Sequence, residues 1–449
     1  MRLRLLLGRA GTGKTRRCLE EICAEVRERP LGPPLLLIVP AQATFNLERE
    51  LAARGGSLRA QVYSFRRLAF RVLREAGGAA RMPVSELGRR MLLKRILLAE
   101  QKNLRLLGSL HNRPGFLASL SELIGELKMC RIFPGDLQEL ADAPEGSTTG
   151  EEGLLQLKLR ELSLVYRRLV EHLAGRFSDP DDYLELLAQR IQEAAWGKDC
   201  RVWVDGFISF TPQEYAVLAA LFTKARELTI TLCLDPGYVR QRPEEDDPFS
   251  KPWETLTHLR RLARQAKVAV AEEFLEPDGN WRLARAPELA HLERQFFRYP
   301  TVVYSGPVKR VSLLEGVNLR AEVAGVVRIV RRLLREDGLR PRQIMVAVRD
   351  PDAYFPLFRR ALADYEIPFF IDYRRPVMHH PLVEMLRSAL EVGQKNWAPD
   401  PVFRYLKTGL TGVSAEEVDR LENYVLATGI RGSRWYDRQP WDYLPGRTW

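Results

Sequence analysis

Cysteine, histidine and long apolar runs are all scarce in this sequence of 449 residues. The 5 cysteines are scattered without any Cys-x-x-Cys pair, and the 6 histidines add no zinc-binding pattern. We therefore expect reduced thiols and a cytoplasmic protein. No apolar run reaches the roughly 18 residues that a membrane span needs. The apolar start, residues 1–7, is too short for the core of a signal peptide and predicts a buried strand.

Acidic side chains are outnumbered by basic ones, 58 against 69, which gives a net charge of +11. A positive charge of this size favours a polyanionic partner, nucleic acid before membrane. Most of the basic residues are arginines, which suit bidentate contacts with phosphate. A GC-rich genome would also enrich arginine, so composition alone gives nucleic acid only a small advantage.

The order of apolar segments predicts an α/β fold with parallel sheets and a large all-helical insertion. Strands and helices alternate in 1–75, beginning with a strand at Leu3–Leu7 and a second at Leu35–Val39. Residues 84–196 carry apolar side chains at helical spacing and form the insertion. Strand patterns return in 197–300, at Arg201–Val204 and Leu228–Leu234.

A second α/β unit is predicted in 301–395. Its expected strands are Val311–Leu314, Ile344–Val348 and Pro368–Ile371, and its expected helices cover about 321–335 and 354–363. Residues 396–449 have a helical pattern and reach residues 445–449 without an evident closing element.

A glycine-rich loop between the first strand and the first helix carries the strongest chemical signal. Its sequence matches G-x-x-x-x-G-K-[ST] in full, the pattern of P-loop nucleotide-binding proteins. Glycines allow backbone conformations that aim several N–H groups at phosphate. We expect Lys14 to reach the β- and γ-phosphates of ATP and the Thr15 hydroxyl to bind Mg²⁺. The loop consists of Gly8, Arg9, Ala10, Gly11, Thr12, Gly13, Lys14 and Thr15.

An ATPase also needs carboxylates at the end of a neighbouring strand. Asp205 follows the strand Arg201–Val204 and is the candidate for the metal, but the next residue is Gly206, where helicase ATPases carry the catalytic glutamate. Glu214 has the position of a capping-box residue behind Thr211 and Pro212. No catalytic residue is therefore assigned, and the sequence predicts nucleotide binding rather than efficient hydrolysis.

A basic segment with interleaved aromatic side chains follows, over residues 59–78. Cations that track phosphates and rings that stack on bases are typical of a single-strand DNA path. The alternative is an amphipathic helix with Phe65, Leu68 and Phe70 partly buried and the arginines solvated. The candidate DNA-binding residues are Arg59, Tyr63, Ser64, Phe65, Arg66, Arg67, Arg71 and Arg74.

Four segments in the same order resemble the AddB family, the second subunits of bacterial AddAB helicase–nucleases. They are Gly8–Thr15, Leu36–Phe45, Arg59–Gly78 and Val204–Tyr215. The resemblance implies a scaffold of the superfamily-one helicase type: domain 1A in 1–83 and 197–300, 1B in 84–196, 2A in 301–395 and the start of 2B in 396–449. Segments Ile344–Arg349 and Ile367–Ile371 are similar to strands of the second motor domain of UvrD/RecB-type helicases.

The resemblance also implies partners and a task. An AddA-type subunit would supply the motor of a heterodimer that processes double-strand DNA ends for recombination. The chain itself would bind single-stranded DNA and scan the exiting strand for a recombination hotspot. Ser64 and Phe65 would match a strand-contacting Thr-Phe-His segment, with Arg66 in place of the histidine.

AddB-type chains are longer and end in a nuclease domain with a four-cysteine iron–sulfur site. We therefore expect this sequence to be an N-terminal part, with the nuclease and the cluster belonging to the intact protein. Two alternatives stay open: an autonomous ATP-driven DNA translocase, and a P-loop phosphotransferase acting on a small molecule. The first needs a catalytic carboxylate that the sequence does not offer. The second fits poorly with a large helical insertion.

Overall fold

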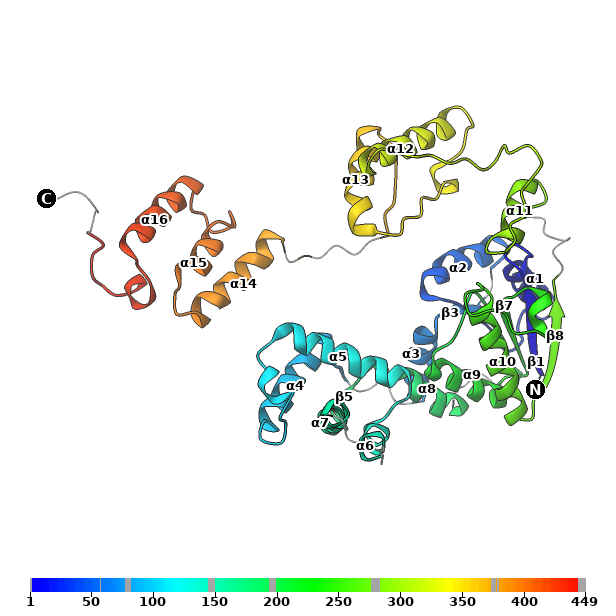
Figure 1. Ribbon diagram of the computed structural model, residues 1–449, viewed down its shortest axis with the longest axis horizontal. Helices are drawn as coiled ribbons and strands as arrows, with labels where there is room; N and C mark the ends of the chain where they lie inside the picture. Colours follow the sequence, from blue (N-terminus) through cyan, green and yellow to red (C-terminus); the bar gives the residue numbers. More distant parts are fainter. Residues whose placement is uncertain are drawn as a thin grey trace. The chain divides into compact units, whose positions relative to one another are not determined.

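The computed structural model describes residues 2–56, 58–76, 82–143, 150–193, 199–275, 283–372, 377 and 379–442. Within the ranges named above, residues 77–78, 144–149 and 445–449 are among those that lie outside this part. The chain divides into two compact units, Met1–Val311 and Ser312–Trp449. Figure 1 colours the chain from the N-terminus in blue to the C-terminus in red. Within the described ranges, no helix combines the length and the apolar composition that a membrane crossing requires.

A six-stranded sheet forms the centre of the first unit, in the order β3-β2-β6-β7-β1-β8. All of its pairings are parallel, which confirms the predicted parallel α/β sheet. Such a sheet must be covered on both faces, and consecutive leucines of one strand enter different cores: Leu5 on one face and Leu6 on the other. The strands are β1 (Arg2–Gly8), β2 (Leu35–Ile38), β3 (Ala60–Tyr63), β6 (Arg201–Val204), β7 (Glu227–Cys233) and β8 (Ala269–Phe274).

Helices cover both faces of this sheet. Helices α1 (Lys14–Glu28) and α2 (Thr44–Ala53) pack on one face, where Leu19 and Leu51 join the core around Leu6. The other face carries four helices, α3 (Phe65–Glu75), α8 (Tyr183–Arg190), α9 (Pro212–Lys224) and α10 (Ser250–Gln265). Helix α11 (Pro287–Gln295) follows later in the same unit.

The helical insertion has a core of its own. Its helices are α4 (Glu86–Ala99), α5 (Pro114–Met129), α6 (Pro134–Asp142) and α7 (Gly150–Leu173). Tyr166, Leu93 and Ile124 lie in its buried centre, and two short strands, β4 (Met82–Pro83) and β5 (Phe177–Ser178), pair in parallel. Helix α8 falls in the range predicted for the insertion, but Tyr183 and Leu187 pack in the core of the sheet instead.

The second unit contains two groups of helices. Helices α12 (Leu319–Arg335) and α13 (Pro351–Asp364) enclose a core around Val327 and Phe358. Helices α14 (Pro381–Gln394), α15 (Pro399–Leu406) and α16 (Ala415–Thr428) follow, with a separate core around Phe403 and Val425. Helices α12, α13, α15 and α16 agree with the helical patterns in the sequence, whereas α14 was not predicted.

The three strands predicted within residues 301–395 are not found. Residues 311–314, 344–348 and 368–371 belong to no strand. Ile344 and Val348 pack against the helical core, whereas Met345 and Val346 are 91% and 44% exposed. A parallel sheet needs cover on both faces, and within the described residues only one side of this segment is covered.

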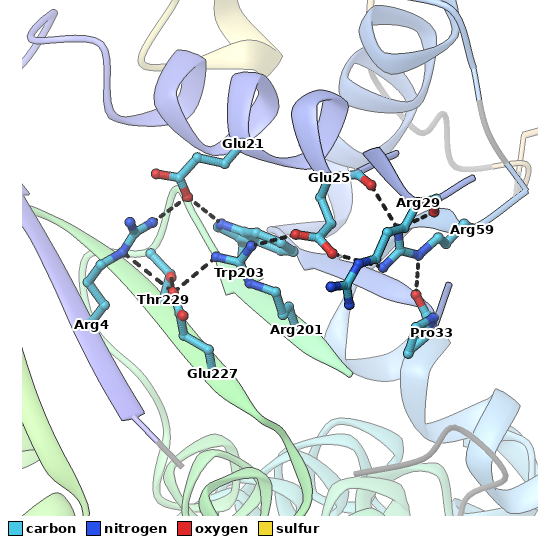
Figure 2. Close-up of polar contacts among 10 residues, drawn as sticks. All are labelled: Arg4, Glu21, Glu25, Arg29, Pro33, Arg59, Arg201, Trp203, Glu227 and Thr229. Carbon is cyan, nitrogen blue, oxygen red and sulfur yellow. Dashed lines mark hydrogen bonds and ion pairs between the residues drawn. The ribbon is translucent and has the colours of Figure 1, made fainter. Parts of the chain in front are cut away.

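A polar network joins three strands of the sheet to helix α1 (Figure 2). Glu21 of α1 accepts hydrogen bonds from Arg4 of β1 and, at 3.1 Å, from Trp203 Nε1 of β6. Arg201 bridges Glu25 of α1 and Glu227 of β7, at 3.0 and 3.2 Å. Burial alone would raise the pKa of Glu21, but the hydrogen bonds from Arg4 and Trp203 outweigh it and hold that pKa below its ordinary value. The contacts that Glu21 makes with Arg4 and Trp203 therefore contribute their full stability only while Glu21 is ionised.

We predict that Glu21→Gln lowers the free energy of unfolding by about 1–3 kcal/mol at pH 7, because a charged partner of the mostly buried Arg4 is removed. A lowered folded-state pKa contributes stability above the unfolded-state value of roughly 4.3 and loses it as the pH falls through the folded-state pKa. The deficit of the variant should therefore shrink below about pH 4. Urea titrations at neutral and acidic pH measure it.

Glu20→Gln is the matched control, since the Glu20 side chain is 48% exposed and pairs with Arg16 at the surface. A variant Glu21→Gln as stable as this control at pH 7 would show that the charge of Glu21 contributes nothing to stability.

Candidate nucleotide site and nucleic-acid interface

The carboxyl ends of the parallel strands bring the predicted site residues to one edge of the sheet. The glycine-rich loop follows β1, Asp205 follows β6, and Asp235 follows β7. Strands β1 and β7 are direct neighbours, with Gly8 opposite Cys233 in register. The loop therefore lies beside residues that are about 200 positions away in the sequence.

Glycine is required at several points of the loop. Gly11 and Gly13 have φ values of 82° and 92°, a region that residues with a Cβ atom rarely adopt. A Cβ atom on Gly8 would lie 2.6 Å from Thr12 Oγ1. Gly13 is also the N-cap of α1, and no side chain caps this helix end. The backbone thus has the bends and the uncapped helix start that a phosphate cradle needs.

Lys14 lies over this loop. Its Nζ atom donates hydrogen bonds to the carbonyl oxygens of Gly8 and Arg9, at 2.7 and 2.8 Å. Burial lowers the pKa of Lys14 below its ordinary value. A largely desolvated ammonium group attracts an anion more strongly than an exposed one, so the position suits contact with phosphate.

Thr15 and Asp205 meet at the start of α1. The Thr15 hydroxyl donates to Asp205 Oδ2 at 2.7 Å, and Thr231 of β7 donates to Asp205 Oδ1 at 2.5 Å. Asp205 is 4% exposed. The structure therefore brings together the two residues that the sequence assigns to Mg²⁺. It also adds Thr231, which the sequence shows only as one polar residue within a strand and which therefore gave no functional signal.

Gly206 occupies the position after Asp205 with a φ of 84°. A Cβ atom there would lie 3.3 Å from the Pro40 ring, so a glutamate would require both strain and displacement. Glu214 caps α9: its carboxylate accepts from the Thr211 amide at 2.8 Å while the Thr211 hydroxyl accepts from the Glu214 amide at 3.2 Å. This confirms the predicted capping box and occupies Glu214 away from any water-activating role.

Arg9 forms a clamp that sequence reasoning missed. Its guanidinium, 7% exposed, pairs with Asp235 at 2.5 Å and with the Glu293 carboxylate of α11 at 2.9 Å. It also donates to the Glu293 carbonyl and lies over the Phe249 ring. Burial would raise the pKa of Asp235, but hydrogen bonds from the Gly237 amide and Arg9 hold it below its usual value. The only advance signal was an arginine within the phosphate-loop pattern.

Together these residues fit a magnesium–nucleotide complex. The loop supplies a glycine-lined backbone, Lys14 supplies a buried cation, and Thr15 and Asp205 supply oxygen ligands of the kind that Mg²⁺ prefers. Lys14 supplies the cation for the phosphates, since Arg9 is paired with Asp235 and Glu293.

Arg59 is placed differently from the other predicted DNA-binding residues. It is 8% exposed, and its guanidinium donates to the backbone oxygens of Pro33, Glu25 and Arg29 and to the Glu25 carboxylate (Figure 2). These contacts tie the residue before β3 to the end of α1. A strand of DNA has no access to this guanidinium, so we leave Arg59 out of the DNA path proposed below.

Ser64 and Phe65 are also mainly structural in position. Ser64 is the N-cap of α3 and its Oγ accepts from the Arg67 amide at 3.3 Å. Phe65 is 4% exposed and packs edge-on against Phe207 and Phe210, with ring centroids 5.4 and 6.2 Å away. Both residues hold the start of α3 against the segment that follows Asp205.

The outer face of α3 carries the accessible part of the basic segment. Arg66, Arg67 and Arg74 are exposed, and the Phe70 ring among them is 42% exposed. Arg71 contacts the Tyr63 hydroxyl and Glu75, and Arg67 pairs with Glu48 of α2 at 2.7 Å. Tyr63 and Arg67 line an open pocket of about 380 Å³ between α2 and β3. The amphipathic helix and the exposed cation–aromatic face therefore exist in the same element.

The sequence matches known proteins over most of its length. Residues 5–293 match the family described as "ADDB, N-terminal". A curated relative from Moorella thermoacetica is 49% identical over 446 residues, which cover 99% of this chain and 39% of the relative. Relatives from Pelotomaculum thermopropionicum and Desulforudis audaxviator are each 48% identical, covering 99% of this chain and 38% of the relative.

All three relatives are named as the B subunit of an ATP-dependent helicase/deoxyribonuclease. The chain spans about two fifths of the length of these relatives. With a family match that covers more than half of its residues and relatives that are nearly half identical, the chain belongs to the AddB family.

Proposed function

We propose that this chain is the ATP- and DNA-binding part of a subunit of an ATP-dependent DNA helicase/exonuclease. The enzyme would process double-strand DNA ends for recombinational repair in the cytoplasm, with an AddA-like partner as its motor subunit. The names of the relatives support the subunit role. The observation that carries the proposal is the contact between Thr15 and Asp205 beside the glycine-rich loop.

ATP would be held by residues 8–15, with Lys14 at its phosphates and Thr15 and Asp205 near Mg²⁺. The metal would neutralise phosphate charge when bound. Thr231 would orient the Asp205 carboxylate, and the Arg9 clamp would keep the loop next to Asp235 and Glu293. Backbone N–H groups of the loop and of the first turn of α1 complete the anion site.

Hydrolysis by this chain would be weak or absent. The position that holds the water-activating glutamate in helicase ATPases is a glycine in the left-handed region, and Glu214 caps a helix. Loss of a general base typically slows a reaction by 10²–10⁴-fold. This part of the protein would therefore use bound ATP as a structural or regulatory ligand.

DNA would lie along the outer face of α3. Arg66, Arg67 and Arg74 would contact phosphates and the Phe70 ring would stack on a base. Tyr63 and Arg71 lie at the edge of this face and hold each other through the Tyr63 hydroxyl. Ser64 and Phe65 would position the helix rather than touch the strand.

Calorimetry with Mg²⁺-ATP should show binding to the wild-type chain, and Lys14→Ala should abolish it, because the cation at the phosphates is lost. Turnover should stay far below the 1–10³ per second of typical enzymes. Lys251→Ala, which changes an exposed lysine on α10, is the control. Rapid hydrolysis that disappears with Lys14 would contradict the proposal of binding without turnover.

Replacing Arg66 and Arg67 by glutamine should weaken the binding of single-stranded oligonucleotides. The plot of log K against log salt should become shallower by about 0.7 for each phosphate that is no longer neutralised. Fluorescence anisotropy over a KCl series measures both effects.

A double variant of Arg54 and Arg90 is the charge-matched control, since both pair with a glutamate one turn away on their own helix. Phe70→Ala should lower the affinity without changing the salt slope, because stacking releases no counterions. If both double variants bound oligonucleotides with the same affinity and salt slope, the arginines of α3 would be solvent-exposed side chains without a role in DNA binding.

A further inference from the structure

Helix α12 of the second unit carries a row of arginines that the proposed function does not use. The helix has five arginines and a single carboxylate, Glu322. Arg328, Arg332 and Arg335 are exposed, and Arg331 lies at the margin of the row with its guanidinium over the Tyr365 ring, 5.2 Å from the centroid. We call Arg328, Arg332 and Arg335 the α12 row.

The row is set opposite the buried face of the helix. Val323, Val327 and Val330 are buried against the core shared with α13. At 100° per residue, the α12 row points to the other side, with its members about 6 and 4.5 Å apart along the axis. Packing therefore fixes both the backbone that carries the three guanidinium groups and the direction in which they leave it.

The α12 row lacks the partners that other helix arginines have. Arg16, Arg90 and Arg420 each pair with a glutamate one turn away. Among the residues that the structure describes, no carboxylate lies within ion-pair distance of Arg328, Arg332 or Arg335, although Glu336 and Asp337 follow the helix directly.

Unpaired like charges one turn apart destabilise a helix. The negative helix terminus favours Arg332 and Arg335, which lie in the last turn. It does not account for Arg328, which lies two turns before the end. A polyanion would relieve the repulsion over the whole row.

We propose that the α12 row is a second DNA-binding surface, which contacts the phosphate backbone of duplex DNA. The proposal rests on the DNA-processing function proposed above. Guanidinium groups bind phosphate oxygens in bidentate geometry, and a duplex presents about one negative charge per 1.7 Å of its axis. Helix α12 contains no aromatic residue, so it offers charge without the stacking rings typical of single-strand paths. This absence distinguishes it from α3 and favours the duplex.

The test compares two triple variants of the whole chain with the same change in net charge. One replaces Arg328, Arg332 and Arg335 by glutamine. The other replaces Arg360, Arg387 and Arg420, exposed arginines of the same unit that lie near carboxylates on their own helices. Binding of a 30-base-pair duplex and of a single-stranded oligonucleotide is measured by anisotropy from 50 to 300 mM KCl, together with the thermal unfolding of each variant.

We expect the α12 variant to lose at least about tenfold in duplex affinity at 50 mM KCl, with a salt slope shallower by up to about 2.7. The control triple should lose much less, single-strand binding should change little, and the unfolding temperature should not fall. An equal loss in both triples, or duplex binding that is unchanged, would overturn the proposal and leave the row to solvent or to an acidic protein surface.

The outcome is separable from that of the proposed function. Nucleotide binding through Lys14 and single-strand binding through Arg66 and Arg67 are measured on the same proteins. If those persist while the α12 variant binds duplex normally, only the second surface fails. If they fail while duplex binding still depends on the α12 row, the function proposed for the first unit fails.

Discussion

The contact between Asp205 and two hydroxyl groups holds together the edge of the sheet at which we propose that nucleotide binds. Thr15 comes from the start of α1, Thr231 from β7, and Asp205 from the end of β6. A carboxylate that is 4% exposed is costly to bury unless hydrogen bonds satisfy it. Both of its oxygens are satisfied here, so the ends of two strands and one helix keep a fixed relation. The glycine-rich loop, Gly206 and the Arg9 clamp are all arranged around that relation.

Much of this edge could be predicted from the sequence because its signals are local. The glycine and lysine pattern specifies the loop. An aspartate directly after a strand, Asp205, indicates the carboxylate that meets Thr15. The Arg9 clamp was out of reach, because Asp235 and Glu293 are 226 and 284 residues away and only the fold brings them near. Strand β8 was missed for another reason: it is an edge strand, and Glu272 and Glu273 hide its pattern in the way that charged edges often do.

Arginines show why composition alone does not give function. Arg59 appears in the sequence as part of a basic segment, yet it is buried and binds the backbone at the end of α1. Arg66 lies seven positions later on the exposed face of α3. Arg59 precedes β3 and contacts the end of α1, whereas Arg66 lies on the outer face of α3. The packing of helices on the sheet decides both positions. The second unit gives the same lesson, because residues 344–348 have the composition of a strand, yet Met345 and Val346 are exposed and the segment belongs to no strand.

The geometry after Asp205 gives a physical reason for binding that is separate from turnover. A ligand that binds only the folded state at 100 times its dissociation constant stabilises that state by about 2.7 kcal/mol. Here the ligand would contact the loop, which Arg9 connects to Asp235 after β7 and to Glu293 on α11. Bound nucleotide would thus reinforce the arrangement of β1, β6 and β7 without requiring a base at Gly206. A residue with a side chain at that position would meet Pro40 and an unfavourable φ. The backbone at Gly206 therefore disfavours a glutamate, which supports the proposal of nucleotide binding without efficient hydrolysis.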